Sequence, residues 1–228
     1  MSATVNVLNP TGGRSRIPLE LAARCAHRGC VQNSTESIAT IANAVSMVRS
    51  LGSHGCVLCA IASQETPLLF AGLAIHLIGD IADGAVARRR RAETVCGATL
   101  DIVCDRLFYG VYYTAFGMLH PEMLPAVGIF LFTFMVLDAH LSLSFLLQPL
   151  RSVNYFFLVD RVIYRWNFSK PGKTLLGAPL LMTTLLFESP ASSTAIAASL
   201  AMVKTCSLWR LYRPRVQLRP GCTVQVLS

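Results

Sequence analysis

The chain has 228 residues, a length that a single domain can account for. Hydrophobic residues make up 53% of it and charged residues only 14%, a balance that excludes an ordinary soluble protein and is typical of a membrane protein with several spans. The net charge of +8 would suit a nucleic-acid partner, but its distribution along the chain, described below, argues against one.

The first 33 residues contain Gly, Pro and Arg and are not strongly apolar. They lack the short charged region, apolar core and small-residue cleavage site of a signal peptide, so we expect a cytoplasmic N-terminal tail at 1–33. From Ser34 to Ile38 the sequence has a helix-capping pattern that includes Glu36. It predicts an N-terminal amphipathic segment that leads into the first membrane span.

Six apolar segments follow, and we expect each to form a transmembrane helix of an all-α, polytopic membrane domain at 34–213. The six predicted spans are Asn43–Ser63, Pro67–Ala87, Ala98–Leu119, Met123–Leu147, Thr174–Phe187 and Ala191–Leu211. A basic C-terminal tail at 214–228 completes the predicted organisation.

Four carboxylates gather where the second and third spans meet, although the whole chain has only 12 acidic residues. Asp80 and Asp83 are i,i+3, and Asp101 and Asp105 are i,i+4, so each pair shares one face of its helix. Two adjacent antiparallel helices would bring all four into one small volume. Ionised groups near a bilayer core are costly unless a metal, a cation or a substrate compensates them, so the cluster is a predicted functional site.

Repulsion among four neighbouring carboxylates is relieved by a hard divalent cation such as Mg²⁺, which prefers oxygen ligands. The nearest basic residues in the sequence are not expected to neutralise four acids, which disfavours a purely structural salt-bridge network. Gly84 leaves room for a ligand to approach the backbone, and Arg88 can meet a phosphate on the same side. His76 lies one turn before Asp80, where a histidine buried in the core is the simpler interpretation.

The connection between the fourth and fifth spans, 148–173, has the pattern of an amphipathic helix. Phe156, Val159, Ile163 and Trp166 recur at helical spacing, with charged residues off that face. This predicts an interfacial helix at the cytoplasmic surface of the membrane.

The same connection carries five basic residues from Arg151 to Lys173. Together they could hold a phosphorylated small molecule, with Arg151 and Arg161 as the first candidates because they are closest to the fourth span. Simple anchoring among lipid headgroups is the alternative for each of them. Within the fourth span, Asp138 also requires a partner, which could be structural or belong to a subunit contact.

Lys and Arg occur in separated groups along the chain. They are found up to Arg49, at Arg88–Arg91, between Arg151 and Lys173 and from Lys204 onward, with Arg106 inside the third span. The three other connections contain none, which is the positive-inside pattern of membrane proteins. It predicts that both termini and the acidic cluster lie on the cytoplasmic side, where basic groups meet anionic lipid headgroups.

The acidic cluster also resembles a known signature. The residues read Asp80-Ile-Ala-Asp83-Gly84-Ala-Val-Ala87-Arg88 and, after eight further residues, Gly97-x3-Asp101-x3-Asp105. This resembles the CDP-alcohol phosphotransferase signature, D-x2-D-G-x2-A-R-x8-G-x3-D-x3-D, at all eight fixed positions. Upstream, Asn43-Ala-Val-Ser46-Met-Val-Arg49 is similar to the N-x-x-[ST]-x-x-R stretch at the start of that family's first membrane helix.

The resemblance implies an enzyme of phospholipid biosynthesis in which an acceptor hydroxyl attacks the phosphorus of a CDP-linked substrate and CMP leaves. It implies Asp80, Asp83 and Asp101 as metal ligands, and Asp105 as general base and further metal ligand. The implied CDP-binding residues are Asp80, Gly84, Ala87, Arg88 and Gly97. The family typically uses two metal ions, here Mg²⁺ or Mn²⁺, and forms homodimers.

Small six-span members of bacterial size most often take CDP-diacylglycerol and a water-soluble acceptor, so the resemblance implies phosphatidyl transfer in a bacterial cell membrane. The basic residues of 151–173 favour a phosphorylated polyol such as glycerol 3-phosphate or inositol phosphate. The inositol option is weakened because Gln148-Pro-Leu-Arg151 stands where a K-A-R-A-like stretch is expected. An unphosphorylated acceptor such as serine, and transfer from a CDP-alcohol onto diacylglycerol, are alternatives.

Two further alternatives belong to other classes of protein. A cation-coupled transporter would place its acidic residues near the bilayer midplane and at broken helices. A non-catalytic membrane scaffold would have no need of the eight signature positions. We therefore expect a transferase.

Overall fold

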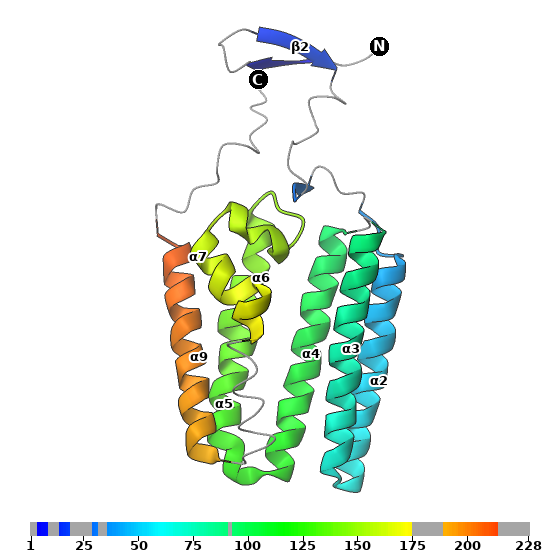
Figure 1. Ribbon diagram of the computed structural model, residues 1–228, viewed down its shortest axis with the longest axis vertical. Coiled ribbons are helices and arrows are strands. Elements are labelled where there is room, and N and C mark those ends of the chain that lie inside the picture. Colours follow the sequence, from blue (N-terminus) through cyan, green and yellow to red (C-terminus); the bar gives the residue numbers. More distant parts are fainter. Residues whose placement is uncertain are drawn as a thin grey trace.

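The computed structural model describes residues 4–8, 14–18, 29–31, 36–90, 93–174 and 189–213. Within them the chain is mostly helical, as predicted, and the long helices run side by side in a bundle (Figure 1). Four of these helices are α2 (Ile41–Ser63), α3 (Thr66–Arg89), α4 (Val95–Leu119) and α9 (Pro190–Leu211).

A further helical run, Pro121–Leu147, completes the described bundle. It is built from η2 (Pro121–Met123), α5 (Leu124–Phe132), η3 (Thr133–Asp138), α6 (Ala139–Leu143) and η4 (Ser144–Leu147). Its middle, η3, is a π-helical turn, a form that usually occurs as a single turn inside an α-helix.

Helices α2, α3 and the run Pro121–Leu147 are long and apolar enough to cross a membrane. Five of the six predicted spans coincide with helices, to within a few residues at their ends. The fifth predicted span, Thr174–Phe187, lies outside the described residues after Thr174. The total of six spans therefore stays a prediction.

The helices form two neighbouring groups, visible in Figure 1, with α2, α3 and α4 in one and α5 and α9 in the other. Helix α2 lies against both α3 and α4, and α5 lies against α9. One apolar core contains side chains from both groups and begins beside the predicted site, at Phe108. Its largest fully buried side chains are Leu69, Phe108, Tyr112, Phe116 and Met123.

The predicted interfacial helix is instead a series of short helical segments, η5 (Val153–Leu158), α7 (Arg161–Ile163) and η6 (Tyr164–Phe168). Asp160 interrupts the helix because its Oδ1 accepts hydrogen bonds from the backbone N–H groups of Val162 and Ile163, at 2.8 and 2.9 Å. This is the capping geometry that begins a new helix.

The apolar face predicted for that connection is divided between the core and the surface. Phe156 and Ile163 are buried in a second core cluster with Leu141 and Phe145, whereas Trp166 is 46% exposed. Packing against the end of the bundle, in addition to helical periodicity, therefore decides which apolar side chains are buried. A position at the membrane interface stays a prediction.

The first bundle helix begins later than its sequence suggests. Thr40 is the N-cap of α2, and its Oγ1 accepts from Asn43 N at 3.1 Å. Glu36, expected to cap the same helix, instead accepts from the backbone N–H groups of Val95 and Cys96 at the start of α4, both at 3.0 Å. A carboxylate is stabilised at a helix N-terminus by these free N–H groups.

The N-terminal region departs from the all-α prediction in one short hairpin. Strands β1 (Thr4–Leu8) and β2 (Arg14–Pro18) pair antiparallel, with Val5 opposite Ile17. Polar and apolar residues alternate from Thr4 to Val7, the pattern of a strand with one apolar face.

Asp138 has the partners that its buried position requires. Its Oδ2 lies 2.5 Å from Arg106 Nη2 of α4, and its Oδ1 lies 2.6 Å from Lys204 Nζ of α9. Arg106 also donates to Phe134 O at 3.1 Å and stacks over the Phe134 ring. This Arg106–Asp138–Lys204 triad links α4, η3 and α9 inside the bundle, so the partner is structural, one of the two outcomes that the sequence left open.

Candidate active site

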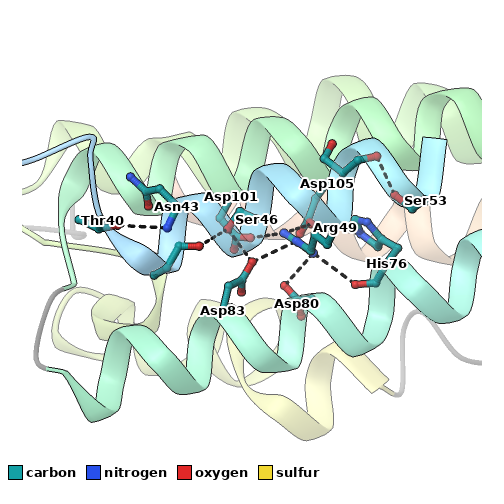
Figure 2. Close-up of polar contacts among 12 residues, drawn as sticks. Thr40, Asn43, Ser46, Arg49, Ser53, His76, Asp80, Asp83, Asp101 and Asp105 are labelled. Carbon is teal, nitrogen blue, oxygen red and sulfur yellow. Dashed lines mark hydrogen bonds and ion pairs between the residues drawn. The ribbon is translucent and has the colours of Figure 1, made fainter. Parts of the chain in front are cut away.

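Helices α2, α3 and α4 position the four signature carboxylates between the middle of the helices and one of their ends. Asp80 and Asp83 lie in the second half of α3, and Asp101 and Asp105 lie in the first half of α4. Because α3 and α4 are joined by a short connection and run in opposite directions, the two pairs face one another (Figure 2). This is the convergence that the i,i+3 and i,i+4 spacings predict.

A single guanidinium, that of Arg49 on α2, lies among the four carboxylates (Figure 2). It forms ion pairs with Asp80 at 3.5 Å, Asp83 at 3.0 Å and Asp105 at 3.2 Å, and a further ion pair with Asp101. The Arg49 side chain is only 2% exposed.

The basic residues nearest in sequence were not expected to neutralise the four acids, and Arg49 was not among the residues considered. Arg49 is distant from the signature in sequence but adjacent in space, and it reduces a formal charge of four negative units to three. The remaining negative charge still requires a cation or a cationic ligand group.

Three of the four carboxylates form a group that could hold a metal ion. Asp80, Asp101 and Asp105 each offer an oxygen, and these three oxygens lie within 4.8 Å of one another. Their side chains are partly exposed, at 46%, 38% and 30%, so a ligand can reach them. Hard divalent cations prefer such an all-oxygen donor set, so the residues fit Mg²⁺ or Mn²⁺.

Asp83 has a different environment. It is buried, with a side chain only 6% exposed, and its Oδ2 accepts from Ser46 Oγ at 2.6 Å while facing Arg49 Nε at 3.0 Å. Both contacts come from α2, so Asp83 fixes α3 against α2 behind the three exposed carboxylates. Its predicted role as a metal ligand stays a prediction.

The other signature positions surround this group. Arg88 is exposed, and its guanidinium lies over Gly84, where an added Cβ would come within 2.9 Å of Nη1. Ala87 is half-buried on the same helix. Their predicted contact with the cytidine diphosphate stays a prediction, although Arg88 is accessible to a phosphate.

Two glycines allow the helices to approach closely around the site. A Cβ at Gly97 would lie 2.9 Å from Asn43 Oδ1, so α4 approaches α2 closely there. A Cβ at Gly79 would collide with the Arg49 side chain. Gly79 therefore leaves the space through which Arg49 reaches the carboxylates, a role that the sequence alone did not suggest.

His76 is buried, as expected, and it also points into the site. Its Nε2 lies 3.3 Å from Asp105 Oδ1, although the ring is almost fully buried. Its position one turn before Asp80 indicates this orientation, because residues four apart share a helix face.

Ser46 and Arg49 are functional candidates that sequence reasoning missed. They belong to the upstream stretch that is similar to the family's, but no role in the site was expected for them. The signal was their three-residue spacing with Asn43, which directs all three to one face of α2. Figure 2 shows this face turned toward α3 and α4.

The predicted acceptor-binding residues lie in the connection after η4. Arg161 is exposed and Arg151 is half-buried. A third basic residue, Lys173, lies near enough to Asp80 for the two charges to interact. Lys173 is therefore an additional candidate, although in sequence it is the most distant of the five from the fourth span.

Comparison with known protein families agrees with the signature. A family model described as CDP-alcohol phosphatidyltransferase matches residues 39–207, the greater part of the chain and all the residues of the site. Comparison with curated proteins and with solved structures gave no match.

Proposed function

The chain belongs to the CDP-alcohol phosphatidyltransferase family, and on this basis we propose that it transfers a phosphatidyl group from CDP-diacylglycerol to the hydroxyl of a small polar acceptor, releasing CMP. The acceptor proposed is a phosphorylated polyol such as glycerol 3-phosphate or inositol phosphate. The proposed setting is phospholipid synthesis at the cytoplasmic face of a bacterial membrane, by a homodimer.

One observation carries the proposal beyond the family match. The oxygens of Asp80, Asp101 and Asp105 converge within 4.8 Å on the partly exposed side of the cluster, while Arg49 and Asp83 occupy its buried side. Such a cluster can bind a divalent cation and a diphosphate together, which is what transfer from a CDP-linked lipid requires.

In the proposed mechanism, Asp105 removes the proton from the acceptor hydroxyl as its oxygen attacks the phosphorus attached to diacylglycerol. A new P–O bond forms, the P–O bond to CMP breaks, and CMP leaves with that electron pair. Asp80, Asp101 and Asp105, with Asp83 as a further proposed ligand, would hold divalent cations, and these would neutralise the diphosphate and the leaving CMP. Arg88, accessible beside Gly84, binds a phosphate oxygen of the donor.

A cation-coupled transporter is the alternative from another class. Its ion sites are expected at interrupted helices near the membrane midplane. Here α3 and α4 continue without interruption through all four carboxylates, which lie between the middle of these helices and the end that carries the basic run beginning at Arg88. The geometry therefore favours a site that meets headgroups and soluble acceptors.

The direct test is incubation of the purified protein with CDP-diacylglycerol, Mg²⁺ and a panel of acceptors, with measurement of CMP release. Release with a phosphorylated polyol supports the proposal. Release only with a CDP-alcohol donor and diacylglycerol supports the alternative direction of transfer. Failure to release CMP with every donor and acceptor would contradict a transferase function.

Activity is expected to require a divalent cation, with Mg²⁺ or Mn²⁺ effective and Ca²⁺ poor. The reason is that Mg²⁺ requires compact octahedral coordination, whereas Ca²⁺ takes more ligands at longer distances. CMP release should fall to background in excess EDTA and return on addition of Mg²⁺ in excess of the chelator. Undiminished release in EDTA would contradict the metal site.

The choice of acceptor is expected to depend on the connection at 151–173. Arg151, Arg161 and Lys173 should be replaced singly with Ala. The variant that lacks the residue in contact with the acceptor's phosphate should show a KM for that acceptor raised by about ten- to a hundredfold, because one charge-assisted contact is lost. The KM of the CDP-lipid should change far less.

The matched control for this prediction is Arg213→Ala, which removes an exposed positive charge after the end of α9. It should leave both KM values near those of the wild type. If none of the five basic residues of 151–173 affects the acceptor KM, the acceptor is uncharged or lipidic, and the alternative direction of transfer gains support.

A further inference from the structure

The ring of His76 is held rigidly against the helix that carries Asp105. It is 1% exposed and stacks on Phe108, with ring centroids 3.9 Å apart and planes within 9° of parallel. Tyr109 packs edge-on against the same ring at 5.2 Å. Phe108 and Tyr109 follow Asp105 by one turn of α4, so the imidazole has a fixed position relative to that carboxylate.

The hydrogen on the imidazole can be assigned from its neighbours. Nε2 lies 3.3 Å from Asp105 Oδ1, and because an ionised carboxylate only accepts hydrogen bonds, a bond at this contact requires the hydrogen to be on Nε2. Nδ1 is buried and has no hydrogen-bond partner among the described residues. A buried polar atom without a partner is costly and therefore calls for a functional explanation.

The contacts that described residues make to Asp105 converge on one of its two oxygens. Oδ1 faces His76 Nε2 at 3.3 Å and Arg49 Nη2 at 3.2 Å. Arg49 is shared among all four carboxylates, whereas His76 forms an ion-pair contact only with Asp105 among the described residues. His76 is thus the contact that distinguishes the proposed base from the other three acids.

We propose that His76 is a positioning residue that fixes Asp105 by donating its Nε2–H to Oδ1, so that Oδ2 is presented to the acceptor hydroxyl. The inference rests on the proposed function, in which Asp105 is the general base. It adds a residue from α3, outside the eight signature positions, to the apparatus that moves the proton. A base held in one orientation transfers a proton more efficiently than one that rotates.

The test is the comparison of three variants in the CMP-release assay with the full-length protein. His76→Phe keeps a stacked ring but loses the donor, and kcat should fall by about ten- to a hundredfold, as expected for loss of a hydrogen bond to a charged group. His76→Gln keeps a side-chain N–H donor and should recover part of that loss. The Kd for Mn²⁺ and for the CDP-lipid, measured without an acceptor, should stay near the wild-type values in both.

His54 provides the third variant, a matched control. It also packs on Phe108, edge-on at 5.8 Å, but its Nδ1 bonds to Ser50 O at 2.6 Å and no ion pair joins it to Asp105 among the described residues. His54→Phe therefore tests loss of an imidazole from the same aromatic group and should leave kcat near the wild-type value.

Three outcomes would overturn the proposal. If the wild type is active and His76→Phe has the same kcat, the role of His76 is contradicted but the proposed function is not. Equal losses of kcat and of thermal stability in His76→Phe and His54→Phe, with no recovery in His76→Gln, assign His76 to packing. A wild type that releases no CMP under any condition contradicts the proposed function itself, and with it this role.

Discussion

Replacing Asp105 with Asn is expected to lower kcat by about a hundred- to ten-thousandfold, the range for loss of a general base. The Asp105→Asn variant would keep the shape of the side chain and could still contact Arg49 and His76 through its amide oxygen, but the amide could not take up the proton of the acceptor hydroxyl. Binding of CDP-diacylglycerol should be largely intact, because Asp80 and Asp101 can still hold the metal and the loss of a base affects only the chemical step.

The matched variants are Asp80→Asn and Asp101→Asn. These residues belong to the same group of converging oxygens but have no contact with His76 among the described residues. They should lose Mn²⁺ and CDP-lipid binding together, as measured by calorimetry or spin resonance on the purified protein. If all three variants lose binding equally, Asp105 is only another metal ligand, and the base must be sought elsewhere.

Replacing Arg49 with Met is expected to destabilise the metal-free protein by about 3 kcal/mol, the lower end of the range for removing one partner of a buried ion pair. The lower end applies because Asp80, Asp101 and Asp105 are partly exposed and stay partly hydrated. Without Arg49, the four carboxylates would have no Arg or Lys in ion-pair contact among the described residues.

The measurement is thermal unfolding in detergent, with EDTA and with excess Mg²⁺. The Tm of Arg49→Met should fall in EDTA, and Mg²⁺ should raise it by more than it raises the Tm of the wild type, because the ion then supplies the missing positive charge. Arg88→Met is the control, since Arg88 is exposed and should contribute little to stability. An unchanged Tm for Arg49→Met in EDTA would show that Arg49 is not the counter-ion of the cluster.

The convergence of the carboxylates could be predicted because helical spacing fixes which side chains share a face. Asp80 with Asp83, and Asp101 with Asp105, needed only the assumption of two adjacent antiparallel helices. The central place of Arg49 could not be predicted in the same way. It depends on the rotation of α2 about its axis and on the space left by Gly79, both of which are set by packing among three helices.

The positions of the long helices were predictable from hydropathy, which depends only on local sequence. The caps of the helices and the structure of the connections were not. Glu36 caps α4 and not its own neighbouring helix, because the partner is chosen by proximity in space. The amphipathic pattern of Phe156, Ile163 and Trp166 did not reveal the break at Asp160. A side chain that can cap a helix competes there with the continuation of the helix.

Asp105 and Arg106 are consecutive on α4, and consecutive helical residues point about 100° apart. Asp105 is tied to Arg49 on α2 and His76 on α3, while Arg106 is tied through Asp138 to Lys204 on α9. One turn of α4 is thus clamped from two directions by opposite charges. A rotation of α4 about its axis would therefore disturb both sets of ion pairs together, the one at the carboxylates and the one that reaches α9.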